Sequence, residues 1–300
     1  MNSEREKMLI VGDNPFHGIS HLSQERARIR GLETAYPRYA ANLVVTSLEN
    51  GANGFMFSVS ETTLSILRII REMEKSKHTR LYAIVPYAFE YVRLAAQIGI
   101  PGLARNFAKQ IAVSGNMSAI AVGLKGVIRT DPMALLKMYL IYEISRIESS
   151  VGKQANLVSV LLHEIITDMA LAFNLDWIFR SYVDFMLDLE IKPGFNTRNF
   201  AYLVEKFTEW NIDFREIVIA APFNKLGFQM NPTKTECEKA LAGLPEANII
   251  AISILAAGYL NPHEAVSYIR NLPNLKGVVV GVSKEQHARE TFKLIKANLA

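Results

Sequence analysis

The chain has 300 residues, of which 50% are hydrophobic and 21% are charged, and its formal net charge is +4. This composition supplies a sizeable core, and the length suits a single α/β barrel. The charge is mild, and no run of Lys and Arg with interleaved aromatic residues occurs, which argues against nucleic acid as a partner. One cysteine, Cys237, excludes an intramolecular disulfide and a cysteine-based metal site.

The N-terminal segment MNSEREKMLIVGD is charged and then directly strand-like, so it lacks the apolar core of a signal peptide. No segment approaches the roughly 18 consecutive apolar residues that a membrane-spanning helix needs. We therefore expect a soluble, cytoplasmic protein that does not associate with membranes.

The first part of the chain alternates between strand and helix patterns. Residues 8–13 predict a strand, followed by a long loop that holds His17 and His21. Helical spacing at residues 39–50 and 60–75 flanks a second strand at residues 54–58, and LYAIVPY at residues 81–87 predicts a third.

From Ala88 to Gln154 the apolar spacing becomes helical throughout and predicts about three helices. The pair Asp131-Pro132 is a good helix start, since Asp suits the N-cap and Pro the first helical position. Residues 118–128, SAIAVGLKGVI, fit either a helix or a strand.

The stretch LVSVLLHEIITD at residues 157–168 begins with an almost purely apolar run that is closed by His163 and Glu164. Such a run predicts a strand buried on both faces, as in parallel sheets. A long helix is expected at residues 168–190, a short strand at 191–196 and a helix at 198–211. The remaining strands are expected at residues 217–224, 249–255 and 277–283, and their helices at 233–242, 262–270 and 284–298.

Eight strands with helical partners predict an eight-fold (β/α) barrel, the TIM barrel. No linker or low-complexity segment divides the chain. We therefore expect one domain over residues 1–300, with a helical insertion between the third and fourth strands at about residues 88–154.

Four motifs in the second half resemble the aldo/keto reductase family in their order along the chain. They are LLHEIITD, IKPGFNTRNF, IAISILAAGYL and VVVGVSKEQHARETF. The first resembles the family's fourth strand, which ends in a hydrophobic-hydrophobic-His motif, with His163 as that histidine. The last resembles its eighth strand and phosphate-holding loop. The resemblance implies a TIM barrel, an NADP cofactor and carbonyl reduction.

The catalytic pattern of that family is mostly absent. The family's Asp, Tyr and Lys correspond here to Ser58, a SETT segment without Tyr, and Pro86, so only His163 remains of the four. Hydride transfer to a carbonyl needs a proton donor of matched acidity, which the missing residues supply in the family.

Polar residues follow the predicted strands and should gather at the C-terminal mouth, where barrels of this kind place their active sites. The candidates for acid-base catalysis are His163, His17, Asp13 and Glu61. The candidates for holding a cofactor or phosphate are Gly281, Ser283, Lys284 and Asn196. Further mouth residues are Asn14, Ser60, Tyr87, Glu90, Glu164, Arg198, Asn224, Lys225 and Tyr259.

Each assignment has an alternative. His17 and His163 with a carboxylate could instead bind a divalent metal, although the spacing matches no known signature. Asp13 and Glu61 could be a turn residue and a helix-start residue. Lys225 could form a Schiff base, although it lies beyond the strand. GVSKEQ could hold an anion at a helix start, or Ser283 could only cap that helix.

Three functions are compatible with these residues. The first is an enzyme that acts on a small polar, possibly phosphorylated, ligand by histidine and carboxylate acid-base chemistry. The second is an NADP-dependent oxidoreductase with a substitute acid such as Tyr87. The third is a barrel that binds a ligand without catalysis.

Overall fold

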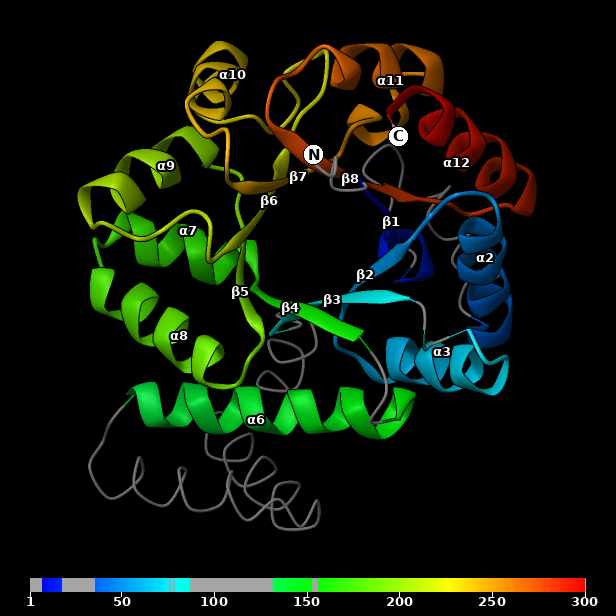
Figure 1. Ribbon diagram of the computed structural model, residues 1–300, viewed down its shortest axis with the longest axis horizontal. Coiled ribbons are helices and arrows are strands. Elements are labelled where there is room, and N and C mark those ends of the chain that lie inside the picture. Colours follow the sequence, from blue (N-terminus) through cyan, green and yellow to red (C-terminus); the bar gives the residue numbers. More distant parts are fainter. Residues whose placement is uncertain are drawn as a thin grey trace, which may run out of the picture.

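The computed structural model describes residues 7–17, 36–75, 77, 79–86, 132–152 and 156–299. Eight parallel strands pair in the order of the chain and close into a barrel, as Figure 1 shows. The strands are β1 (Met8–Gly12), β2 (Gly54–Ser58), β3 (Arg80–Val85), β4 (Asn156–Leu162), β5 (Lys192–Asn196), β6 (Val218–Pro222), β7 (Asn248–Ile252) and β8 (Leu275–Gly281). The predicted α/β class and TIM barrel are confirmed.

Helices surround the ring of strands. The described α-helices are α2 (Pro37–Glu49), α3 (Glu61–Glu72), α6 (Pro132–Val151), α7 (Glu164–Ala172), α8 (Asp176–Asp188), α9 (Phe200–Glu209), α10 (Lys234–Ala242), α11 (Pro262–Arg270) and α12 (Glu285–Leu299). Among the described residues, the 3-10 helices η1 (Asn14–His17) and η3 (Ala256–Gly258) follow β1 and β7. In this part of the chain, no helix combines the length and the apolar character needed to cross a membrane.

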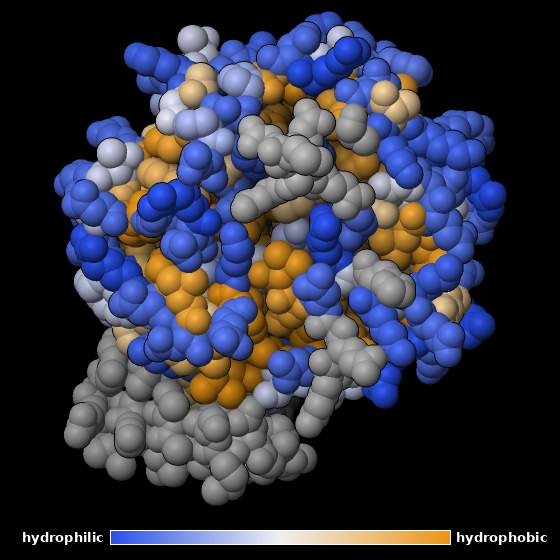
Figure 2. Space-filling view, in the orientation of Figure 1, coloured by the Kyte–Doolittle hydropathy of each residue, from blue (hydrophilic) through white to orange (hydrophobic). Residues whose placement is uncertain are grey.

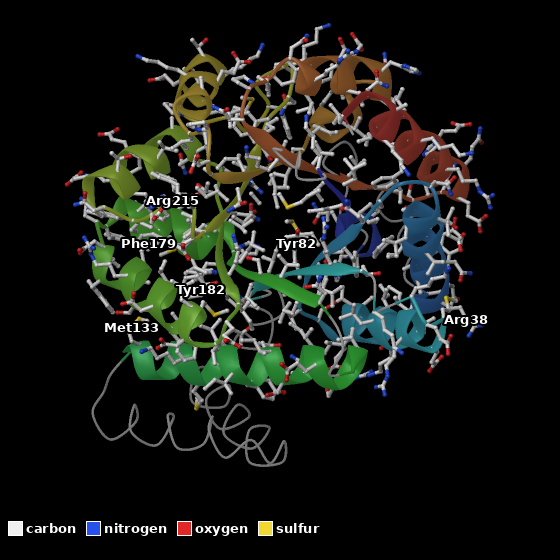
Figure 3. The ribbon with its side chains drawn as sticks, in the orientation of Figure 1. Arg38, Tyr82, Met133, Phe179, Tyr182 and Arg215 are labelled. Atoms are coloured by element: carbon white, nitrogen blue, oxygen red, sulfur yellow. The ribbon has the colours of Figure 1, made fainter. Side chains whose placement is uncertain are left out.

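The barrel interior is filled by side chains that alternate along the strands with side chains facing the helices. Ile10, Met56, Tyr82 and Leu161 belong to the inner cluster. Tyr82 lies in the middle of the ring in Figure 3, and its burial raises its pKa to about 12. The interior is therefore a packed core, as expected for eight strands.

The second apolar layer lies between the strands and the helices. Phe179 of α8 packs against Phe195 of β5 and Phe207 of α9, with ring centroids 5.6 and 5.1 Å away. Figure 3 places Phe179 and Tyr182 beside β5. On the face seen in Figure 2, hydrophilic residues cover most of the outer helices and hydrophobic residues show nearer the middle.

One helix prediction was wrong. The expected single helix at residues 168–190 is two helices, because α7 ends at Ala172 and α8 begins at Asp176. Asn174 lies between them with a φ of 51°, a left-handed conformation that Asn adopts more easily than most residues. The first helix also starts earlier than expected, at Glu164, directly after the candidate histidine.

The predicted insertion between the third and fourth strands is described only in part. Helix α6 starts at Pro132, where the sequence predicted a helix start, and lies outside the ring between α3 and α8 (Figure 1). The remaining predictions for residues 87–131, including the helix-or-strand alternative at 118–128, fall outside the described residues. The one-domain organisation stays a prediction.

Candidate functional site

Two polar side chains from neighbouring strands meet at the end of the barrel where the strands finish, which we call the C-terminal rim. Leu161 of β4 belongs to the barrel interior, and His163 follows it two residues later. An added Cβ at Gly194 of β5 would touch Leu161, so Asn196, two residues later, also faces inward. Leu162 pairs with Phe195, which places His163 beside Asn196.

His163 caps helix α7 with its own ring. Its Nδ1 accepts a hydrogen bond of 3.2 Å from the Ile165 backbone N–H, so the neutral ring carries its proton on Nε2. That Nε2 lies 3.6 Å from Oε2 of Glu164. Burial lowers the pKa of His163 below its usual value, opposed by the nearby carboxylates of Glu164 and Asp13. At neutral pH the ring is therefore an uncharged hydrogen-bond donor at the rim.

Glu164 joins the β4 and β5 ends of the rim. Its Oε2 accepts a 2.8 Å hydrogen bond from Asn196 Nδ2, and its Oε1 accepts one of 2.8 Å from Arg198 Nη2. A carboxylate can only accept here, which fixes the Asn196 amide with its nitrogen toward Glu164. Asn196 Oδ1 is buried and has no hydrogen-bond partner among the described residues. A buried acceptor of this kind needs a partner from elsewhere.

Asp168 holds the loop after β5 onto α7. Its Oδ1 accepts a 2.5 Å hydrogen bond from the Thr197 hydroxyl, and its Oδ2 accepts one of 3.2 Å from the Arg198 backbone N–H. Burial raises the pKa of Asp168, and these hydrogen bonds work in the opposite direction. The contacts fix the backbone from which Asn196 and Arg198 project.

A second histidine-carboxylate pair lies after β1. His17 Nε2 is 2.9 Å from Oδ2 of Asp13, and the same oxygen accepts a 2.7 Å hydrogen bond from the Ser58 backbone N–H. Both side chains of the pair are almost completely buried. Asp13 follows β1 and His163 follows β4, so both lie at the same end of the parallel barrel, and the Asp13 carboxylate raises the pKa of His163. The structure thus brings three of the four predicted acid-base residues to one rim.

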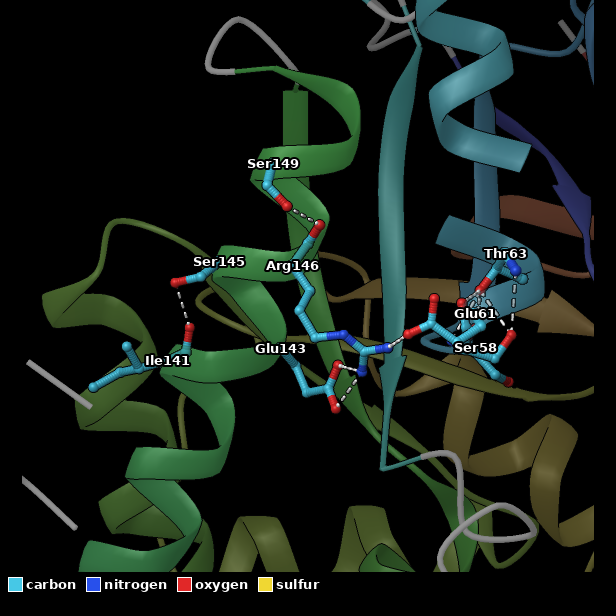
Figure 4. A network of polar contacts seen from close by, with 9 residues as sticks. Ser58, Glu61, Thr63, Ile141, Glu143, Ser145, Arg146 and Ser149 are labelled. Atoms are coloured by element: carbon cyan, nitrogen blue, oxygen red, sulfur yellow. Dashed lines mark hydrogen bonds and ion pairs between the residues drawn. The ribbon is translucent and has the colours of Figure 1, made fainter. Parts of the chain in front are cut away.

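Glu61, the fourth, belongs to a different network, shown in Figure 4. Its side chain is 71% exposed, and its Oε1 lies 2.6 Å from Arg146 Nη2. Arg146 of α6 also donates hydrogen bonds of 3.1 and 2.9 Å to the buried carboxylate of Glu143. The contact ties the start of α3 to α6, so Glu61 has a structural partner outside the rim pairs.

The other mouth residues have mixed surroundings. Asn224 is buried and makes two 2.8 Å hydrogen bonds to the backbone of Phe228, so it fixes its own loop. Lys225 is exposed and lies 3.1 Å from a Glu264 carboxylate oxygen, which favours a surface ion pair over a Schiff-base role. Tyr259 is exposed. His21, Tyr87 and Glu90 fall outside the described residues.

The predicted phosphate loop lies between β8 and α12. The Ser283 backbone carbonyl accepts a 3.4 Å hydrogen bond from the Tyr39 hydroxyl, and Lys284 is exposed just before the helix. An added Cβ at Gly281 would lie 2.8 Å from Pro15 Cδ, so this strand end must be glycine for the β1 loop to approach.

The sequence suggested neither the role of Glu164 as a shared partner nor the half-buried Asp168. Glu164 follows His163 directly, and Asp168 lies one helical turn later on α7. A helix start at residue 164 would have indicated that both project from one end of α7 toward the β5 loop. Among the described residues, no group of three or more His, Cys, Asp or Glu side chains is placed to hold a metal ion.

Fold and rim together define a (β/α)8 barrel with two histidine-carboxylate pairs at its C-terminal rim. No protein-family model and no curated protein matches the sequence. Two solved structures from Pseudomonas aeruginosa, each titled as a "putative aldo-keto reductase", match it in fold with TM-scores of 0.59 and 0.58. Each match covers 97% of this chain and 90% of the other, at 12% identity. The resemblance that the sequence indicated is confirmed for the barrel fold.

Proposed function

We propose that this protein is an enzyme that performs acid-base chemistry on a small polar molecule at the C-terminal rim. The observation that carries the proposal is the pairing of two histidines with carboxylates, Asp13 with His17 and Glu164 with His163, at one end of one barrel. A carboxylate beside an imidazole stabilises the ring when it carries a positive charge. Barrels of this class place their reactive groups at this end.

The two histidines are suited to complementary roles. His163 is held neutral by burial, with an Nε2–H that can donate a hydrogen bond to an oxygen on which negative charge develops. In the other pair, His17 Nε2 lies 2.9 Å from Asp13 Oδ2, so the carboxylate orients this imidazole and stabilises it when it takes up a proton. Together they provide one hydrogen-bond donor to a developing charge and one pair that can take a proton.

The test uses a substitution that keeps the helix cap. Asn is a favourable N-cap residue, so His163→Asn preserves the start of α7 while removing the imidazole. We expect it to lower kcat/KM by about a hundredfold or more for whichever member of a panel of small carbonyl and hydroxyl compounds the wild type converts. His263→Asn, an exposed histidine on α11, is the matched control. Equal turnover by His163→Asn and the wild type would refute the proposal.

A second candidate is an NADP-dependent oxidoreductase, in which the bound nicotinamide would supply or accept a hydride. The match in fold to the two structures titled as reductases favours it. Ser283 and Lys284 would hold the cofactor phosphate, and the unpartnered Asn196 Oδ1 fits an N–H donor of a carboxamide. His163 would polarise the carbonyl, because Ser58 and Pro86 replace the family's Asp and Lys.

Binding separates this candidate from the first and from a barrel without catalysis. NADPH binding would be followed by the fluorescence of Trp177 and Trp210 and by protection against thermal unfolding. Lys284→Ala should weaken the binding of NADPH at least tenfold. Lys293 is an exposed lysine further along α12, and Lys293→Ala should leave NADPH binding unchanged. If NADPH changes neither the tryptophan fluorescence nor the thermal unfolding, this candidate is excluded. Binding without turnover of any compound supports the non-catalytic alternative.

A further inference from the structure

Asn196 presents an acceptor to the rim that nothing in the described residues satisfies. The side chain belongs to a residue that is 6% exposed, and its Oδ1 has no hydrogen-bond partner there. Its orientation is set by Glu164, which takes the amide nitrogen. Leaving a buried acceptor unpaired is unfavourable, so a ligand group that donates a hydrogen bond gains more here than at an exposed oxygen.

The charges around this acceptor are mainly negative. Glu164 Oε2 lies 2.8 Å from Asn196 Nδ2 and 3.6 Å from His163 Nε2. The carboxylates of Asp13 and Asp168 also raise the pKa of His163, whose ring burial keeps neutral. The guanidinium of Arg198 donates to Glu164 and is the one cation with a contact to these groups in the described residues. An anionic group placed beside Asn196 Oδ1 would face oxygen atoms and a surplus of negative charge.

Asp13 offers a further acceptor. Its Oδ2 takes hydrogen bonds from His17 and the Ser58 backbone, whereas its Oδ1 takes none from the described residues. An ammonium group has three donors and no acceptor, which matches such surroundings. A hydroxyl group matches them less well, because it is uncharged and provides one donor.

We infer that the small molecule bound at the rim carries a protonated amino group that donates to Asn196 Oδ1. This inference rests on the proposed function, since it names the substrate class of the same site. Asn196 and His163 lie side by side at the ends of β5 and β4, so the ligand carries an oxygen for His163 as well as the amino group. The ligand is therefore an amino alcohol or amino carbonyl compound.

The first experiment compares three probes of one size that differ in charge: 1-amino-2-propanol, 1,2-propanediol and lactate. Binding is measured by calorimetry and by thermal protection at equal ionic strength. We expect the amine to bind about ten- to a hundredfold more tightly than the diol, and lactate to bind most weakly. Equal binding of amine and diol, tighter binding of lactate, or no binding of the amine would each overturn the inference.

Glu164→Gln gives a sharper test, because it should reverse the polarity of the site. The Gln oxygen must face Arg198, which only donates, so the Gln nitrogen faces Asn196. The Asn196 amide then turns so that its oxygen accepts a hydrogen bond from the Gln nitrogen, and its own nitrogen points into the rim. We expect the preference to move from the amine toward lactate by at least tenfold. Glu264→Gln, in the exposed pair with Lys225, should leave the preference unchanged.

Asn196→Leu removes the acceptor without putting a donor in its place. It keeps the inference testable if Glu164→Gln does not fold. It should abolish the difference between amine and diol while circular dichroism remains that of the wild type. An unchanged amine preference in either folded variant overturns the inference. The outcome is independent of the acid-base proposal, because His163→Asn should bind the amine within threefold of wild type even where its turnover is lost.

Discussion

Gly194 lies where β5 crosses close to β4, one step below His163 and Asn196. A Cβ at this position would lie 2.5 Å from Leu161 Cγ, 2.7 Å from Ser159 Oγ and 3.0 Å from the Val160 carbonyl oxygen. Two of these atoms belong to side chains packed inside the barrel, and the third is backbone. Gly194→Ala therefore requires the two strands to move apart.

The expected cost follows from two opposing effects. Overpacking of a filled core costs about 1–3 kcal/mol, whereas replacing Gly by Ala gains about 0.4–1 kcal/mol by restricting the unfolded chain. We expect Gly194→Ala to lower the free energy of unfolding by about 1–2 kcal/mol. Gly243→Ala is the control, since its Cβ would meet only the Ala240 carbonyl oxygen at 3.5 Å. It should have no cost and gain a few tenths of a kcal/mol.

Urea unfolding followed by tryptophan fluorescence measures both variants. Combining Gly194→Ala with Leu161→Ala should show a coupling energy, because the nearest clashing atom is then absent. Strand separation should also weaken ligand binding at the rim, since Asn196 moves with β5. Wild-type stability for Gly194→Ala, or purely additive effects with Leu161→Ala, would refute this account of packing at the β4 and β5 crossing.

Variants at three residues test individual contacts. His163→Asn should flatten the loss of stability as the pH falls through about 6.5, because the wild-type ring has a lowered pKa and binds its proton more readily when unfolded; urea midpoints from pH 8 to pH 5.5 check this. Tyr182→Phe should cost about 1–2 kcal/mol in urea unfolding, since the buried hydroxyl donates a 2.5 Å hydrogen bond to the Val160 carbonyl. Asp168→Asn should leave the thermal midpoint nearly unchanged and Asp168→Ala should lower it, because an amide can still serve Thr197 and the Arg198 N–H. A steeper pH dependence of stability in His163→Asn would contradict the first expectation, and wild-type stability of Tyr182→Phe the second. Equal lowering of the thermal midpoint in both Asp168 variants would contradict the third.

Most strands could be predicted because they are apolar runs buried on both faces, as in β2, β3 and β6, which few other structures produce. The division of residues 168–190 into two helices could not, because the apolar spacing continues through Phe173, Asn174 and Leu175. The break depends on one left-handed residue, which leaves little trace in a hydrophobic pattern. Local chemistry, not periodicity, decides such boundaries.

The location of the site at the C-terminal rim could be predicted from the sequence, whereas most contacts between its residues could not. His163, Asp13 and His17 were expected there because they follow strands whose ends meet. Glu61 was expected there too, yet it pairs with Arg146, which lies 85 positions further along the chain. The sequence holds no signal for that pairing, since it depends on how α6 lies against α3. The unpartnered oxygen of Asn196 likewise requires knowing which atom Glu164 engages.

The anchoring of the β2 end has a consequence for how this barrel tolerates change. Ser58 donates its backbone N–H to Asp13 and its carbonyl accepts from the Thr63 hydroxyl of α3, and α3 is fastened in turn to α6 through Glu61 and Arg146. Apart from Asp13, which directly follows β1, the residues in these contacts belong to strands and helices. The connections beyond these residues can therefore lengthen, shorten or diverge in sequence while the carboxylate that orients His17 keeps its position.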